Sequence, residues 1–150
     1  MSRPLAELPE ALSVVGRLLL ESTALALTTI LKTAEDRARQ NTSGRILNAR
    51  SGRLRASIRH RVAVVGGEVR GTLQAGSPSV RYARIHEEGG IINGRPWLTY
   101  QIPGVGWRRS MSVRIPARPY LRPALEQAQT DLGEELTREL RPLLSLEARG

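Results

Sequence analysis

Cysteine and phenylalanine are absent from this 150-residue chain, and lysine, histidine and aromatic residues are scarce. Without cysteine the chain has no disulfide bond, thiolate zinc site, iron–sulfur cluster or cysteine nucleophile. With only two histidines, His60 and His86, we expect no metal site and no cofactor. Apolar residues still make up 40% of the chain, which is enough to bury a core. The length favours a single domain that spans residues 1–150.

Long apolar runs are also missing. A membrane-spanning helix needs ~18–20 residues that are almost free of charge, whereas the most apolar stretch, residues 18–31, is interrupted by Glu21. Glu7 and Glu10 lie where a signal peptide has its apolar core. We therefore expect no membrane partner and no export, and synthesis in the cytoplasm.

Arginine, by contrast, is abundant: the chain has a single lysine among its 23 basic residues, against 14 acidic residues, and a net charge of +9. The charge is unevenly spread, because residues 41–122 hold fifteen arginines and three acidic residues, whereas residues 123–150 hold three arginines and six acidic residues. This division indicates either a polyanion near the middle of the chain or subunits that pair basic with acidic surfaces. A GC-rich genome would also produce the excess of arginine over lysine.

Apolar spacing predicts a long helix near each end of the chain. Residues 5–40 repeat apolar side chains in steps of three and four along two stripes, and the turn formers of residues 41–44 follow. Residues 121–143 repeat the same spacing, and Pro142 should end or kink this second helix. Two stripes make a wide apolar face, so the first helix should contact more than one neighbour.

The first hairpin is predicted from period-2 alternation. Residues 58–65 form one strand, Gly66-Gly67 supplies a two-residue turn, and residues 69–75 form the returning strand. Ser51 is expected to cap a short helical turn just before this hairpin.

A short helix over residues 80–88 should end at Gly89-Gly90. A second hairpin over residues 96–115 then joins strands 97–102 and 107–115, with a proline at each end of the unit. The order helix, hairpin, short helix, hairpin, helix predicts an α+β fold with an antiparallel sheet.

One cluster, formed by His86, Glu87 and Glu88, has the residue types of a catalytic site. It lacks the second histidine of a zinc protease motif, and its glycines follow a helix rather than a strand. We favour a structural interpretation of the cluster, as a helix end with acidic residues beside a partly buried histidine. We expect no enzymatic activity and no catalytic residue, and a hydrolase that uses His86 and Glu88 remains an alternative.

Two stretches are candidates for contact with partners. The second hairpin contains several aromatic residues and an arginine on its apparent apolar face. These residues either cover a sheet face or form a subunit interface. These residues are Trp97, Tyr100, Trp107 and Arg109. The stretch 45–61 is basic without any acidic residue, and it lacks the aromatic residues that stack on single-stranded bases. Its candidate contacts to DNA or to an acidic partner are Arg45, Arg50, Arg53, Arg55, Arg59 and Arg61.

Three segments, in the expected order, resemble motifs of the head–tail joining or tail-completion proteins of tailed phages. Residues 51–58 (SGRLRASI), 82–90 (YARIHEEGG) and 115–125 (IPARPYLRPAL) resemble the patterns TGxLRxSI, YAxxxExGG and IPARPFLRPAL. That group includes minor tail protein Z-like, neck and virion morphogenesis proteins. Tyr120 stands where phenylalanine is commoner, and residues 91–114 align with no motif. The motif residues are Gly52, Leu54, Ser57, Ile58, Tyr82, Ala83, His86, Glu88, Gly89, Gly90, Ile115, Pro116, Ala117, Arg118, Pro119, Tyr120, Leu121, Pro123 and Ala124.

The resemblance implies a virion structural protein that is assembled in the host cytoplasm and lies at the head–tail junction. Such proteins are similar to ring-forming components, for which we favour a hexamer over a dodecamer. The ring would complete the tail or neck between the portal or adaptor side and the tail terminator or tail tube, and DNA would pass through its lumen. A basic protein that binds nucleic acid without sequence preference is the alternative, with an affinity that falls steeply with salt.

The motifs also carry structural expectations. Gly89 should cap a helix in the left-handed conformation. Pro116 and Pro119 should fix the path into the last helix, and Arg118 should pair with Glu87 or Glu88.

Overall fold

The fold follows the predicted order of elements. The computed structural model describes residues 8–44, 46–47 and 52–147. Its elements are α1 (Leu8–Asn41), α2 (Arg53–Ser57), β1 (Arg59–Val65), β2 (Glu68–Gln74), α3 (Ala83–Glu88), β3 (Gly90–Ile102), β4 (Gly106–Ile115) and α4 (Arg122–Glu147). This is the predicted α+β class, and each hairpin forms its own two-stranded antiparallel sheet.

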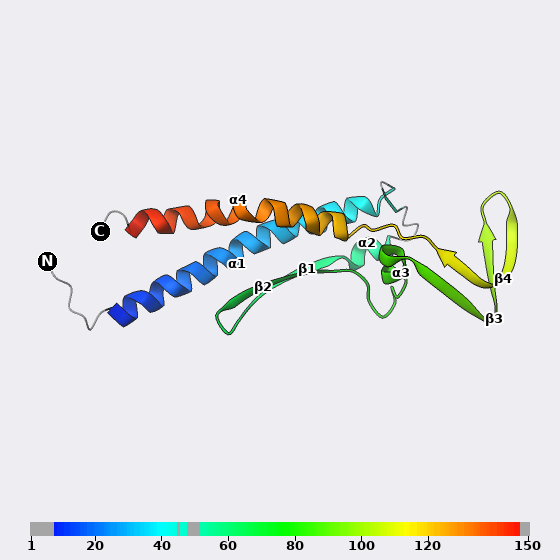
Figure 1. Cartoon of the computed structure of the whole chain (residues 1–150), viewed down its shortest axis with the longest axis horizontal. Coiled ribbons are helices and arrows are strands. Elements are labelled where there is room, and N and C mark those ends of the chain that lie inside the picture. The colour runs from blue at the N-terminus through cyan, green and yellow to red at the C-terminus, as the bar shows by residue number, and fades with distance from the viewer. Residues whose placement is uncertain (1–7, 45, 48–51, 148–150) are drawn as a thin grey trace.

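The molecule is elongated, and its two hairpins have different surroundings (Figure 1). Helices α1 and α4 pack against each other, and the first hairpin, β1–β2, packs along α1. The second hairpin, β3–β4, packs mainly on itself and projects at the end of the molecule opposite to the chain termini.

Helix α1 is buried along only part of its length. One predicted stripe ends at Leu31, Ala34 and Ala38, and these three residues are buried as expected. The other contains Val15, Leu19 and Ala26. It is buried at Ala26 but exposed at Val15 and Leu19, so its predicted burial is wrong toward the N-terminus, because α4 and the first hairpin cover only the later turns.

The exposed part of α1 also bears on the membrane prediction. By length and composition alone, the helix segment Ser13–Asn41 could cross a membrane, because its most apolar 18-residue window has a mean hydropathy of 1.6. Only 17% of that window is buried, so much of this apolar surface lacks a partner in the part of the chain that the structure describes.

The first hairpin has the predicted turn and register. Gly66 and Gly67 take φ values of +60° and +81° between the paired residues Val65 and Glu68. A Cβ at Gly71 would lie 2.6 Å from Leu31 Cδ1, so this strand packs closely on α1. Val64 is exposed near the tip of the hairpin, where the strands diverge from α1 (Figure 1).

The second hairpin is longer than predicted. Strand β3 begins at Gly90 rather than Trp97, and Pro96 lies inside the strand after a cis peptide bond instead of bounding it. The register shifts between Asn93 and Leu98, so the ladder is interrupted where proline has no N–H to donate.

Three helix boundaries also differ from the predictions. Helix α3 begins at Ala83, after turns rather than a helix over residues 80–82. Helix α4 does not end at Pro142 but continues to Glu147. Gly52, in the left-handed conformation, caps α2, and Ser51, the predicted cap, lies outside the described residues.

Candidate functional site

The three motif segments meet in one buried cluster around Tyr120. The side chain of Tyr120 is fully buried and packs in the core with Leu54 and Ile58 from the first motif and Ala83 from the second. Its hydroxyl donates a hydrogen bond to the carbonyl oxygen of Ala83 at 3.3 Å, and its own carbonyl accepts one from the Nδ2 of Asn41 at 3.0 Å. Burial raises the pKa of the Tyr120 hydroxyl, which keeps the group neutral as a donor. The motifs thus tie α1, α2, α3 and α4 together.

Glu87 holds the start of α4. Its Oε2 accepts hydrogen bonds from the backbone N–H groups of Tyr120 at 2.7 Å and Leu121 at 2.9 Å, and its Oε1 accepts one from Arg122 at 2.9 Å. These N–H groups lie at the positive end of the helix dipole, where a carboxylate is stabilised. Glu87 therefore clamps the third motif onto α3.

The predicted ion pair of Arg118 with Glu87 or Glu88 is wrong within the part of the chain that the structure describes. Glu87 is committed to backbone N–H groups, and Glu88 pairs with Arg84 at 2.8 Å on the surface of α3. Arg118 contributes its backbone instead, because its N–H donates to the carbonyl oxygen of His86 at 2.8 Å.

Gly89 ends α3, as predicted, at a point of close backbone contact. A Cβ at this position would lie 2.8 Å from the backbone nitrogen of Ala117. Its φ of +73° is the positive value expected, but its ψ of 178° is extended, so the predicted left-handed cap is wrong. The extended ψ turns the chain directly into β3, which starts at Gly90.

The first motif is fixed by Ser57. Its hydroxyl donates to the carbonyl oxygen of Leu54 at 2.7 Å and accepts from the N–H of Gly76 at 3.0 Å. The hydroxyl therefore joins α2 to the loop that leads from the first hairpin to α3.

His86 lies beside Tyr82, with ring centroids 5.7 Å apart in an edge-on arrangement. Burial, followed by the nearby charge of Arg118, lowers the pKa of His86. Of the two carboxylates that follow it in sequence, Glu87 binds backbone N–H groups at the start of α4 and Glu88 pairs with Arg84. Among the described residues, no group of three or more His, Cys, Asp or Glu side chains is placed to hold a metal ion.

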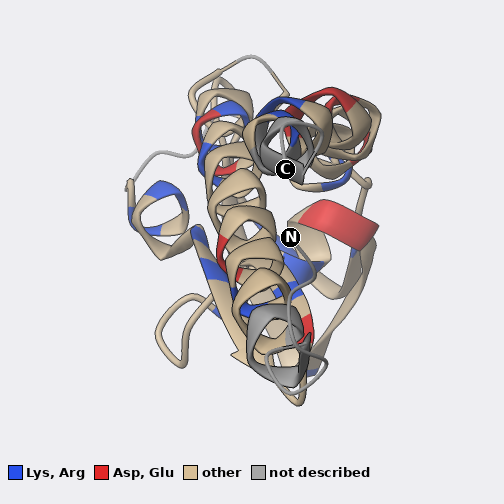
Figure 2. Ribbon diagram, turned by 90° about the vertical axis from the view of Figure 1, so that its left-hand side faces the viewer, with Lys and Arg blue, Asp and Glu red and all other residues tan. Residues whose placement is uncertain are grey.

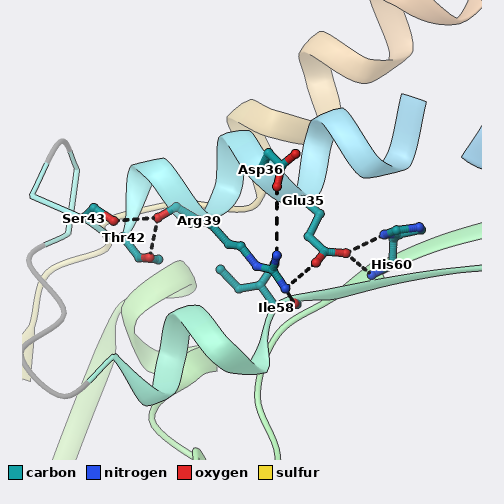
Figure 3. A network of polar contacts seen from close by, with 7 residues as sticks. All are labelled: Glu35, Asp36, Arg39, Thr42, Ser43, Ile58 and His60. Atoms are coloured by element: carbon teal, nitrogen blue, oxygen red, sulfur yellow. Dashed lines mark hydrogen bonds and ion pairs between the residues drawn. The ribbon is translucent and has the colours of Figure 1, made fainter. Parts of the chain in front are cut away.

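A second polar network joins α1 to the first hairpin (Figure 3). The carboxylate of the buried Glu35 accepts the backbone N–H of His60 at 2.9 Å, lies 2.5 Å from its ring Nδ1 and pairs with Arg39. Arg39 also donates to the carbonyl oxygen of Ile58 at 3.2 Å. Burial opposes ionisation of Glu35, but the hydrogen bonds of His60 and the charge of Arg39 outweigh it and lower the pKa of the carboxyl.

The basic stretch forms an exposed surface on α2 and β1. Arg53, Arg55, Arg59 and Arg61 are all exposed and form no ion pair among the described residues, whereas Arg45 and Arg50 lie outside those residues. An open cavity of about 390 Å³ lies beside this surface, and its lining includes two of these arginines and three serines but no acidic residue. Such a lining suits an anionic group.

The second hairpin exposes its largest apolar side chains. Trp97, Trp107 and Met111 are 53%, 67% and 67% exposed, whereas Tyr100 is partly buried. Trp107, Arg109 and Met111 alternate along β4 and therefore share one face of the hairpin. The aromatic residues thus do not cover a sheet face inside this chain.

Charge is divided among the elements as the sequence indicates. The second hairpin contains four arginines and no acidic residue. Acidic positions follow the length of α4, as the red segments of the helix that ends at the C label show in Figure 2. Opposite charges therefore lie on separate parts of one chain.

Sequence reasoning missed Glu87 as the clamp and Asn41 as the buried partner of Tyr120. A carboxylate 33 residues before the chain segment that it caps leaves no local pattern. Asn41 was assigned only to a turn, although its buried side chain reaches across to the third motif. The apolar surface on the early turns of α1 was missed because periodicity indicates a face but not what covers it.

A comparison with protein families matches residues 10–141 to the phage virion morphogenesis family. Comparisons with curated proteins and with solved structures gave no match. The family match includes all three motif segments and the hairpin between the last two. It supports a role in building the phage virion, and the chain belongs to the phage virion morphogenesis family.

Proposed function

We propose that the chain is a structural protein of the head–tail junction, where identical copies form a ring that completes the tail or neck. The ring joins head and tail and leaves a central channel for DNA. The portal or adaptor on one side and the tail terminator or tail tube on the other are its neighbours. Six copies are favoured and twelve are the alternative, following the resemblance to tail-completion proteins.

The exposed apolar face of the second hairpin carries this proposal. Monomeric proteins rarely leave large side chains gathered on a surface unless a partner covers them. Tryptophan, methionine and arginine are the residue types enriched in protein interfaces, and Trp107, Arg109 and Met111 supply all three on one face. In a family of virion assembly proteins, other virion subunits are the natural partners.

Imaging of purified particles tests the proposal. A label fused to the chain should appear at the junction of head and tail, and averaging should reveal a closed ring at that position. Absence of the chain from particles, or its location in the head shell or along the tail, would contradict the proposed position.

The proposed role is structural rather than catalytic. His86→Ala should therefore leave particle assembly intact wherever the variant folds, as circular dichroism would show. Retained structure and assembly in the His86→Ala variant, with no activity lost, would dismiss the hydrolase alternative.

The alternative of nucleic-acid binding is favoured by the unpaired arginines of α2 and β1. If the protein binds DNA, replacing Arg53, Arg55, Arg59 and Arg61 with alanine should lower the salt dependence of binding, by about 0.9 in log–log slope for each lost phosphate contact. Arg70→Ala is the matched control, because Arg70 is already paired with Glu68. Binding that is weak and unchanged in the fourfold variant would dismiss this alternative.

A further inference from the structure

The early turns of α1 carry an apolar stripe that no other part of the described chain covers. Val14, Leu18 and Leu25 follow steps of four and seven residues, so they share a face, and they are between 40% and 55% exposed. Glu21 lies on the same face between Leu18 and Leu25. Glu21 is exposed and forms no ion pair among the described residues. The stripe therefore presents apolar groups around the carboxylate of Glu21, with the exposed Arg17 one helical turn earlier.

The outer face of the second hairpin has the complementary pattern. Arg109 stands between Trp107 and Met111 on that face, and it is exposed without an ion-pair partner in the described part of the chain. The hairpin surface therefore presents apolar groups around one free guanidinium, which binds both oxygens of a carboxylate well.

The two surfaces lie at opposite ends of the molecule (Figure 1). The second hairpin projects at one end, and the N-terminal turns of α1 reach the other, so the hairpin of a chain does not cover the stripe of the same chain. A contact between two different surfaces of identical subunits is heterologous, and it generates a ring when the rotation between subunits closes.

We propose that the second hairpin of one copy docks on the α1 stripe of the next copy, with Arg109 facing Glu21. This inference rests on the proposed function, because it supplies the contact from which the ring is built. The acidic residues of α4, which packs beside α1, add attraction for a hairpin that carries four arginines and no acidic residue. The apolar side chains exclude water around the pair, and the charges set the register of docking.

A lipid surface is the competing occupant of the stripe, given the length and hydropathy of the helix. Glu21 argues against it, because a carboxylate is costly inside a bilayer unless it is paired. A second copy of the chain offers that pairing group in Arg109, whereas the hydrocarbon interior of a bilayer offers none.

Cysteine cross-linking tests the contact directly, since the natural chain has no cysteine. Leu18→Cys combined with Trp107→Cys should give, in purified particles treated with a short thiol cross-linker, a ladder of dimers, trimers and higher species. Each single variant should give no ladder beyond a dimer. The matched control pairs Leu18→Cys with Ser112→Cys, which lies on the opposite face of the same strand, and should give at least tenfold less product.

Charge reversal provides a second readout. Arg109→Glu and Glu21→Arg should each lower the yield of joined particles at least tenfold, and the double variant should restore most of it. Particles that contain the protein at the junction but give no ladder and no rescue would overturn this contact while leaving the proposed function intact. Particles without the protein would overturn the proposed function itself.

Vesicle flotation tests the competing occupant. The full chain should stay unbound with vesicles of phosphatidylcholine, which carry no net charge to attract its arginines. Flotation that is lost in Leu18→Glu, together with an absent ladder, would assign the stripe to lipid and overturn the proposal.

Discussion

Replacing Glu87 with alanine should destabilise the fold far more than replacing Glu88 next to it. Glu87 accepts three backbone N–H groups at the start of α4, at 2.7, 2.9 and 2.9 Å. The N–H of Arg122 is exposed and can turn to water, whereas those of Tyr120 and Leu121 are partly buried. A hydrogen bond to a charged group contributes about 1.5–3 kcal/mol, and loss of a helix cap costs about 0.5–2 kcal/mol. Because the bonds share one carboxylate and do not add fully, we expect a loss of about 2–4 kcal/mol.

The control is the adjacent carboxylate, which is exposed and paired with Arg84 four residues earlier on α3. Such an exposed pair is screened by water and contributes little, so Glu88→Ala should be nearly neutral. Urea unfolding followed by far-ultraviolet circular dichroism measures both variants, with Glu87→Gln expected between them because its amide keeps one acceptor oxygen. Equal midpoints for Glu87→Ala and Glu88→Ala would refute the assignment of Glu87 as the clamp.

Three further predictions concern the backbone, pH dependence and the projecting hairpin. Gly89→Ala should lower stability by about 1–3 kcal/mol in urea unfolding, because a Cβ would lie 2.8 Å from the backbone nitrogen of Ala117 at a φ of +73°; an unchanged midpoint would refute this close approach. The pKa of Glu35 is lowered in the fold from its ordinary 4.5, so stability should fall as the pH drops below that value and through the folded-state pKa. In a pH series of unfolding, Glu35→Gln should flatten this acid limb, and an unchanged limb would contradict the role of the carboxylate. Trp107→Ser should leave the Tm of the free chain within about 2 °C, because surface substitutions change stability by about 0.5 kcal/mol or less; a large drop would show that the hairpin belongs to the folding core.

Local chemistry was enough to predict the elements of the fold. Pairs of glycines predicted the first hairpin turn and the end of α3, because the positive φ values at these positions are costly for residues with a side chain. Prolines were less informative: Pro96 was expected to bound a strand but lies inside β3, and Pro142, expected to end or kink the last helix, does not end it. A proline ends a strand or helix only where its missing N–H would break a needed hydrogen bond, and a register shift removes that need at Pro96.

The sequence could predict which residue types form the candidate surfaces, but it could not predict whether those residues are exposed. Trp97 and Trp107 pointed equally to a covered sheet face and to an interface, and only the path of β3 and β4 away from the helices separates these alternatives. Likewise the spacing of Val15 and Leu19 gave the apolar face of α1, whereas its exposure depends on where α4 and the first hairpin stop covering it. Burial is decided by contacts between distant segments, which periodicity does not encode.

The motif residues and the projecting hairpin divide two tasks between them. Gly90, the last residue of the second motif, pairs with Ile115, the first residue of the third motif, at the base of the hairpin. Glu87, in the second motif, also binds the backbone of Tyr120 in the third motif. Both ends of the hairpin are thus anchored in the buried cluster around Tyr120, while its outer part contacts little else. Substitutions beyond the base should therefore alter the surface of the hairpin with little effect on the core. The motif segments on either side supply the anchoring, whereas residues 91–114, which align with none of the three motifs, supply the projecting part.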